Sequence, residues 1–192
     1  TSPDAPKGRG LALTPSETKT LAIAHDIPVL TPEKLDAQTI ADISTFGCDY
    51  AVVVAYGKIF PEELIAAFPF GVLNVHYSLL PKYRGATPLE ATLLAGERET
   101  GVTIQKMVKT LDAGDIIAQK TVRVAPDETA RELRPRLIAL GAELLADTLP
   151  AHLAGTAQSR RELVTDAADA ERGVGTDRPL LELANLLPPI EV

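Results

Sequence analysis

The apolar run between Asp49 and Gly57 constrains the fold of this chain more than any other segment. It reads Asp-Tyr-Ala-Val-Val-Val-Ala-Tyr-Gly, and its apolar residues are continuous rather than alternating. A strand with one solvated face would carry polar residues at every second position, so a continuous run predicts a parallel strand covered on both faces. The chain is therefore expected to surround this strand with further layers.

Segments with helix-start signals alternate with other apolar segments. The sequence Thr14-Pro15-Ser16-Glu17 predicts a capped helix that runs to about His25, and Asp127 is expected to cap a long helix that ends near Pro150. Helices are also predicted over 32–45, from Pro61 to Gly71 and from Pro88 to Gly96, and strands over 28–30, 72–76, 101–108 and 116–124. This order predicts an α/β fold with a doubly wound, mostly parallel, Rossmann-like sheet.

The alternation ends near Gly155. Residues 156–192 are charged and poor in large apolar residues, apart from a stretch at 180–187 that is compatible with one short helix. A length of 192 residues fits one domain with an appended tail. We therefore expect one domain over residues 1–155 and a linker or C-terminal remnant over residues 156–192.

Charge and composition argue against several function classes. The formal net charge is −7 without a long run of Lys and Arg, and aromatic residues make up only 4%, which disfavours an extended nucleic-acid surface. The single cysteine, Cys48, excludes an intrachain disulfide and a CxxC metal site and is expected in the core. No apolar run has the length of a membrane span and no signal-peptide pattern opens the chain, so a cytoplasmic protein is expected.

Asn74 and His76 are the first candidates for chemistry. They stand at alternate positions of a predicted strand, so both side chains point to one face, close to the strand's carboxyl end. Ligands of open α/β sheets bind in the crevice beyond that end. The pattern alone is equally consistent with a hydrogen-bonded strand-end histidine beside a turn-forming asparagine.

Two motifs connect this strand to a known family. Residues 74–85 read NVHYSLLPKYRG, and residues 111–115 read LDAGD after a strand that begins GVTI at 101–104. The first resembles the signature N-x-H-x-S-L-L-P-x-x-x-G of the folate-dependent formyltransferases, and the second matches the family's later signature with its aspartate at Asp112. Residues 1–16 resemble a loop that the methionyl-tRNA formyltransferases insert. The resemblance extends over about residues 1–155, which would make this region a catalytic domain.

The resemblance implies transfer of a formyl group from 10-formyltetrahydrofolate to the amino group of initiator methionyl-tRNA. The attack of an amine on a formyl carbon creates a negative oxygen, to which the Asn74 amide can donate. His76 is the natural group to take the proton of the amine or to share the oxyanion's charge. Asp112 would hold the imidazole. The chemistry requires no metal, and no His/Cys cluster offers a site for one.

The resemblance also implies binding residues. Family members hold the folate with the turn that is here Ser78, Leu79, Leu80 and Pro81, with the segment Ala55, Tyr56 and Gly57, and with the loop around Asp112, which includes Gly114. The alternative for residues 78–81 is a simple turn that closes a βα unit. Arg9 resembles the loop arginine that approaches the tRNA acceptor end, although a solvated charge is equally consistent. Lys82 and Arg84 would contact phosphate or folate glutamates, or only solvent.

Several features depart from the family pattern. The usual first strand–helix–strand and the C-terminal β-barrel are missing, the basic pair after Gly-Arg-Gly is replaced by Leu11-Ala12, and the large Tyr77 stands where a small residue or proline is more common. We expect the missing first unit to leave apolar faces and strand edges uncovered and to favour self-association. The complete enzyme is expected to be a monomer that does not bind membranes.

Two other functions share the same residues. A sugar-nucleotide N-formyltransferase would use Asn74, His76 and Asp112 and would fit the acidic net charge. An inactive folate-binding or partner-binding remnant would fit the missing first unit. Glycinamide ribonucleotide formyltransferase is less favoured because residues 1–16 have no place in it.

Overall fold

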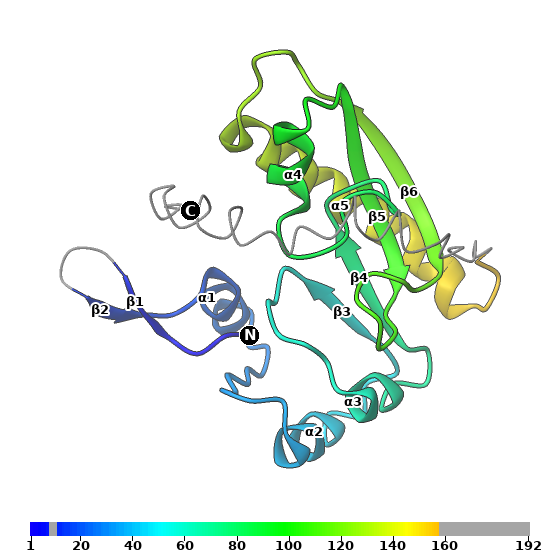
Figure 1. Cartoon of the computed structure of the whole chain (residues 1–192). Coiled ribbons are helices and arrows are strands. Elements are labelled where there is room, and N and C mark those ends of the chain that lie inside the picture. Colours follow the sequence, from blue (N-terminus) through cyan, green and yellow to red (C-terminus); the bar gives the residue numbers. More distant parts are fainter. Residues whose placement is uncertain (8–10, 158–192) are drawn as a thin grey trace.

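The principal sheet has four strands in the order β3-β4-β5-β6 (Figure 1). The computed structural model describes residues 1–7 and 11–157. The strands are β3 (Ala51–Val54), β4 (Val72–His76), β5 (Glu99–Lys106) and β6 (Ile116–Arg123). This mixed sheet, flanked by helices, confirms the α/β class.

The predicted parallel character holds for one pair of strands only. β3 and β4 run parallel, whereas β4–β5 and β5–β6 are antiparallel. Strands β5 and β6 are joined by a loop without a crossover helix, a connection that only antiparallel neighbours allow. The described sheet is therefore mixed rather than mostly parallel.

Helices pack on the sheet and build two apolar cores. Helix α5 (Ala130–Leu153) packs against β4, β5 and β6 and passes behind the sheet in Figure 1, and α4 (Pro88–Leu94) contacts α5. This side holds one core, which includes Leu73, Val75, Val102, Ile104, Leu133 and Leu137. The second core centres on Leu64, Phe68 and Val72, with α3 (Glu62–Ala66) and α2 (Ala37–Ser44) beside it. The side chains of β4 alternate between the two sides, as a strand requires.

Helix starts lie a few residues from their predicted positions. Ser16 rather than Thr14 caps α1 (Glu17–Ala24) and accepts from the Lys19 amide. Asp36 caps α2, so the helix expected from residue 32 begins later. Thr129 and Glu132 form a capping box at the start of α5, where Asp127 was expected. Each start is thus fixed by a side chain that satisfies free backbone N–H groups. Pro150 lies inside α5, which ends at Leu153.

Two predictions for the N-terminal region were wrong. Residues 28–30 form no strand: Pro28 has no N–H to donate, and the Leu30 carbonyl accepts from the Thr1 ammonium instead of from a strand. Residues expected to be loop form a hairpin of β1 (Ala5–Lys7) and β2 (Ala12–Thr14). The predicted tRNA residue Arg9 lies outside the described residues, as do 158–192 with the short helix considered at 180–187.

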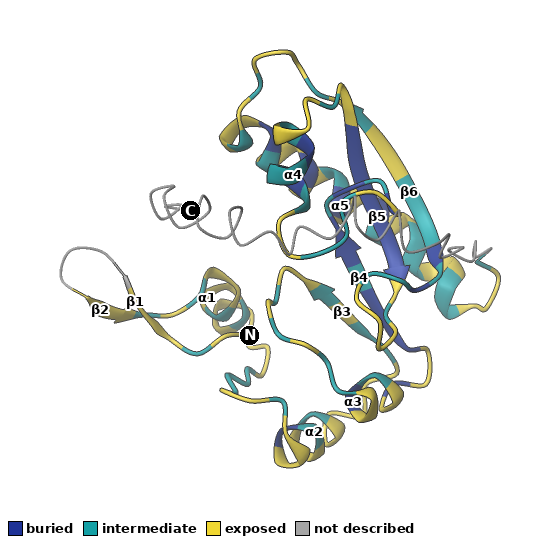
Figure 2. Cartoon of the chain, in the orientation of Figure 1, coloured by how far each residue is buried: buried dark blue, intermediate teal, exposed yellow. Residues whose placement is uncertain are grey.

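Strand β3 is exposed on one face, contrary to the expectation from its apolar run. Its burial alternates: Ala51 and Val53 pack toward the second core, whereas Val52 and Val54 are 37% and 46% exposed. Within the described residues only β4 pairs with it. Figure 2 shows the same exposure over α1, which buries no residue. The expectation of uncovered apolar surface is confirmed for this region. Cys48, expected in the core, is exposed as well, because it lies in the irregular segment between α2 and β3.

Among the described residues, no helix combines the length and the apolar character that crossing a membrane requires.

The exposed face of β3 and the second core, which its other face contacts, predict different responses to substitution. Val52→Lys should change the free energy of unfolding by less than about 0.5 kcal/mol, because its side chain is already solvated. Leu64→Ala should lower it by about 2–5 kcal/mol, because the leucine is fully buried in the second core. Urea denaturation of both variants measures this. A loss from Val52→Lys as large as that from Leu64→Ala would mean that this face is covered.

Candidate active site

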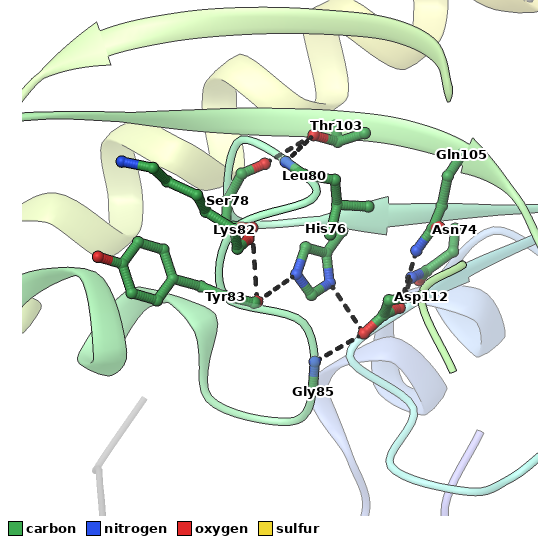
Figure 3. A network of polar contacts seen from close by, with 10 residues as sticks. All are labelled: Asn74, His76, Ser78, Leu80, Lys82, Tyr83, Gly85, Thr103, Gln105 and Asp112. Atoms are coloured by element: carbon green, nitrogen blue, oxygen red, sulfur yellow. Dashed lines mark hydrogen bonds and ion pairs between the residues drawn. The ribbon is translucent and has the colours of Figure 1, made fainter. Parts of the chain in front are cut away.

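The carboxylate of Asp112 lies beside the side chains of both Asn74 and His76 (Figure 3). Asn74 and His76 lie on the same face of β4, opposite the face that carries Leu73 and Val75 to the α5 core. The Asn74 amide Nδ2 donates to Asp112 Oδ1 over 3.4 Å, and His76 Nδ1 lies 3.6 Å from Asp112 Oδ2. The predicted grouping of the three residues is therefore present.

Asp112 is nearly buried and well supplied with donors. Its side chain is 7% exposed. Gln105 Nε2 donates to Oδ1 over 2.7 Å, and the Gly85 backbone N–H donates to Oδ2 over 2.8 Å. A buried charge is tolerated only when it is paired and hydrogen-bonded, and both oxygens meet that condition here. The carboxylate thus ties β4, β5 and the loop at Gly85 to one point.

The loop that carries Asp112 is shaped by a close backbone approach. Asp112 itself has a φ of 47°, in the left-handed region that aspartate tolerates better than most residues. At Gly114, a Cβ atom would lie 1.6 Å from the Lys106 carbonyl oxygen. Only glycine lets the loop pass β5 at this distance. Gly114, predicted as a binding residue, therefore has a structural reason of its own.

His76 has oxygen acceptors at both ring nitrogens. Nε2 lies 2.9 Å from the Tyr83 carbonyl oxygen, which can only accept, so Nε2 carries a proton. Nδ1 faces the Asp112 carboxylate. The ring is 5% exposed, because the loop after β4 lies over it.

A phenol and a carboxylate anchor this loop. Tyr83 Oη donates to Glu97 Oε1 over 2.7 Å, and Lys82 Nζ donates to the same oxygen over 2.9 Å. Burial, together with the bond to Glu97, raises the pKa of Tyr83 to about 12. The bonds from Lys82 and Tyr83 lower the pKa of Glu97. Lys82, considered as a phosphate ligand, pairs with Glu97 here.

The predicted folate turn is fixed by one hydroxyl. Thr103 Oγ1 donates to the Ser78 carbonyl over 2.7 Å and accepts from the Leu80 N–H and from Gln119 Nε2. One donor and two acceptors exhaust the capacity of a hydroxyl. Ser78 Oγ donates to the Lys82 carbonyl within the loop. These contacts fit a closing turn as well as a rigid ligand platform, so folate binding by Ser78, Leu79, Leu80 and Pro81 stays a prediction.

The other predicted binding segment follows β3. Because β3 and β4 are parallel, Ala55, Tyr56 and Gly57 leave the sheet at the same edge as Ser78. Ala55 and Gly57 both have positive φ values. The Tyr56 ring packs edge-on against Phe60 and has the Lys58 ammonium 5.7 Å from its centroid. Their part in binding also stays a prediction.

Sequence reasoning missed the residues that hold the predicted ones in place. Gln105 and Thr103 lie on β5, Gln119 on β6 and Glu97 after α4. The available signal was the alternation of small or polar Gly101, Thr103 and Gln105 with Val102 and Ile104, which marks one polar face of a strand.

Two further observations concern other kinds of site. A cavity of about 220 Å³ lies between the end of α4 and the segment after β6, and none of the predicted site residues lines it. In the ranges 1–7 and 11–157, no group of three or more His, Cys, Asp or Glu side chains is placed to hold a metal ion.

The sequence matches a known family over most of its length. A family profile described as formyl transferase matches residues 1–149. The chain belongs to the formyl transferase family. The methionyl-tRNA formyltransferase of Bdellovibrio bacteriovorus is 50% identical to this formyl transferase chain over 157 residues, which are 81% of the chain and 49% of the relative. The chain thus spans about half the length of the curated relatives it matches.

Solved structures of formyltransferases and a related hydrolase share the fold. Glycinamide ribonucleotide transformylase 1 from Symbiobacterium toebii aligns with a TM-score of 0.65 at 25% identity, covering 70% of this chain and 67% of that one. A formyltetrahydrofolate deformylase from Pseudomonas syringae aligns with a TM-score of 0.63 at 29% identity, covering 72% of this chain and 49% of that one.

Gly114→Ala should disturb the Asp112 loop. The added methyl group would overlap the Lys106 carbonyl, so we expect the free energy of unfolding to fall by about 1–3 kcal/mol. Ala113→Ser, at the neighbouring position, is the control and should change it by less than about 0.5 kcal/mol. Equal stability of the two variants in urea denaturation would contradict the close approach.

The Glu97 anchor should act only while the carboxylate is charged. Because its pKa is lowered from the ordinary 4.5, its bonds stabilise the fold above that pH and are lost as the pH falls through the lower folded value. Glu97→Gln should therefore reduce the free energy of unfolding by up to about 1 kcal/mol at neutral pH. The reduction should shrink at about pH 3, well below the ordinary value. Denaturation at both pH values measures the difference, and a loss that is equal at both would count against this anchor.

Proposed function

We propose that this chain carries the catalytic domain of an enzyme that formylates the amino group of methionyl-tRNA from 10-formyltetrahydrofolate. The observation that carries the proposal is the pairing of His76 with Asp112 beside the Asn74 amide on one strand face. The relative at 50% identity is named a methionyl-tRNA formyltransferase. The 29%-identical neighbour is named for formyltetrahydrofolate, which supports a folate donor.

Each of the three side chains has a distinct role in the proposal. The amine nitrogen forms a bond to the formyl carbon, and the carbonyl oxygen becomes an oxyanion that the Asn74 amide and the Nε2–H of His76 stabilise. When the bond from the formyl carbon to the folate nitrogen breaks, one proton leaves the amine and one arrives on the folate nitrogen. His76 acts as the relay: Nε2 gives its proton to the folate nitrogen and takes one from the former amine. Asp112 keeps the ring oriented and balances its charge.

The loop after β4 has to move away from His76 before the substrate can reach the ring. His76 is nearly buried, and its Nε2 donates to the Tyr83 carbonyl. In the proposed reaction the formyl oxygen takes the place of that carbonyl. The Ser78–Pro81 turn stays fixed to β5 through Thr103, so it offers a rigid wall for the donor while Tyr83 moves and Gly85 stays bonded to Asp112.

The test is an assay with 10-formyltetrahydrofolate and charged initiator methionyl-tRNA that follows formyl-methionine. His76→Ala should lower the rate by about 10²–10⁴-fold, and Asn74→Ala by about 10²–10³-fold. His25→Ala is the matched control and should retain the wild-type rate. His25 is exposed and precedes β3 in the sequence.

Two results would overturn the assignment. Equal rates for His76→Ala and wild type would show that His76 has no catalytic role. Formylation of an amino-sugar nucleotide by a chain that leaves methionyl-tRNA unchanged would give the domain a different acceptor.

A further inference from the structure

Two carboxamides from neighbouring strands share one oxygen of Asp112. Asn74 on β4 and Gln105 on β5 are directly opposed in the antiparallel ladder. Gln105 Nε2 donates to Asp112 Oδ1 over 2.7 Å, whereas Asn74 Nδ2 reaches the same oxygen over 3.4 Å (Figure 3). The shorter contact has the length of a charge-assisted bond, and the longer one does not. Gln105 is therefore the principal side-chain holder of Oδ1.

The orientation of the Gln105 amide is determined by this contact. The opposite orientation would place two acceptor oxygens 2.7 Å apart. With Nε2 toward Asp112, the other end of the amide, Oε1, is buried and has no hydrogen-bond partner among the residues that the structure describes. The side chain is 1% exposed. An apolar side chain of similar size would fill this space without an unsatisfied acceptor. The contribution of the amide at this position is therefore its donor to Asp112, since packing alone does not require it.

The local strand geometry favours this contact. The pairing of β5 with β6 shifts register between Ile104 and Gln105. Irregularities of this kind turn a side chain away from the regular direction and are common beside functional sites. Here the shift occurs where Gln105 meets the carboxylate that belongs to the next loop.

We propose that Gln105 is a positioning residue that frees the Asn74 amide for the oxyanion, an inference that rests on the proposed function. Without Gln105, the Asn74 amide is the side-chain donor to Oδ1 that remains within the described part of the chain. A buried carboxylate binds a donor strongly, so Asn74 would be drawn to Asp112 and away from the formyl oxygen. Gln105 thus acts through Asn74 and does not touch the substrate.

The first test removes the donor and keeps the volume. Gln105→Met should lower kcat by about 10–100-fold, the scale of a misplaced catalytic group, and leave KM for both substrates nearly unchanged. Gln38→Met is the control, since Gln38 Nε2 makes an equivalent bond of 2.8 Å to Asp42 on the exposed face of α2. A wild-type kcat in Gln105→Met would overturn the proposal.

A double-mutant cycle tests the route through Asn74. In an Asn74→Ala background, Gln105→Met should have almost no further effect on kcat, because the group that it releases is already gone. Losses that multiply would show that Gln105 acts independently of Asn74 and would overturn the proposal.

A pH-dependent rescue separates positioning from packing. Gln105→Glu places a second carboxyl group against Asp112, and two such groups share a proton rather than both ionise. The shared proton restores a donor to Oδ1. The rate of Gln105→Glu relative to wild type should therefore rise by at least about 5-fold as the pH is lowered through the range where that proton binds. A ratio that does not change with pH would contradict the positioning role.

A measurement without turnover keeps this inference separate from the proposed function. In Gln105→Met, the Asn74 side-chain amide protons, assigned by their loss in Asn74→Ala, should exchange more slowly with solvent in NMR spectra because Asp112 now holds them. Unchanged exchange would overturn the inference even if the wild-type chain formylates methionyl-tRNA. Slower exchange in a chain without formyl transfer would instead retain the positioning and reject the proposed function.

Discussion

The structure depends on the burial of one carboxylate. Asp112 can occupy its position only because donors from β4, β5 and the loop after β4 converge on its two oxygens. That convergence fixes where the 111–115 loop must run, and the close passage at Gly114 follows from it. It also fixes Gly85, and through the same loop the Tyr83 carbonyl over His76. The hydrogen bonds to the Asp112 carboxylate thus position the residues of the site, while the apolar cores on either side of β4 stabilise the sheet and helices.

The sequence predicted the parts of the site that have a periodic or motif signal. Asn74 and His76 share a face because strand alternation is strict, and β4 lies inside the sheet between two cores. Asp112 was found through its motif. The roles of Gln105 and Thr103 were not predicted. Their strand was predicted from its apolar residues, and that pattern does not report what its polar side chains contact. Their partners lie on other elements, and no local pattern encodes those distances.

The fold was predicted in its class and in most of its elements, and less well in its strand directions and surfaces. The run around β3 indicated burial on both faces, yet burial depends on what covers a strand rather than on its own residues. The antiparallel pairing of β5 and β6 depends on the connection between them, which the apolar pattern does not report. Helix starts shifted by a few residues wherever several Ser, Thr or Asp side chains competed to cap the same turn.

The Tyr83 carbonyl over His76 has a consequence for the apparent affinity of any ligand that needs the ring. A single hydrogen bond of this kind favours the closed arrangement by about 1 kcal/mol, a factor of about five, and the bonds of Lys82 and Tyr83 to Glu97 add to this preference. Only the open form is competent to bind such a ligand, so the measured dissociation constant would exceed the intrinsic one by at least about fivefold. Glu97 touches neither substrate, but it accepts a hydrogen bond from Tyr83. It therefore influences the dissociation constant by changing the fraction of molecules in which the loop is open.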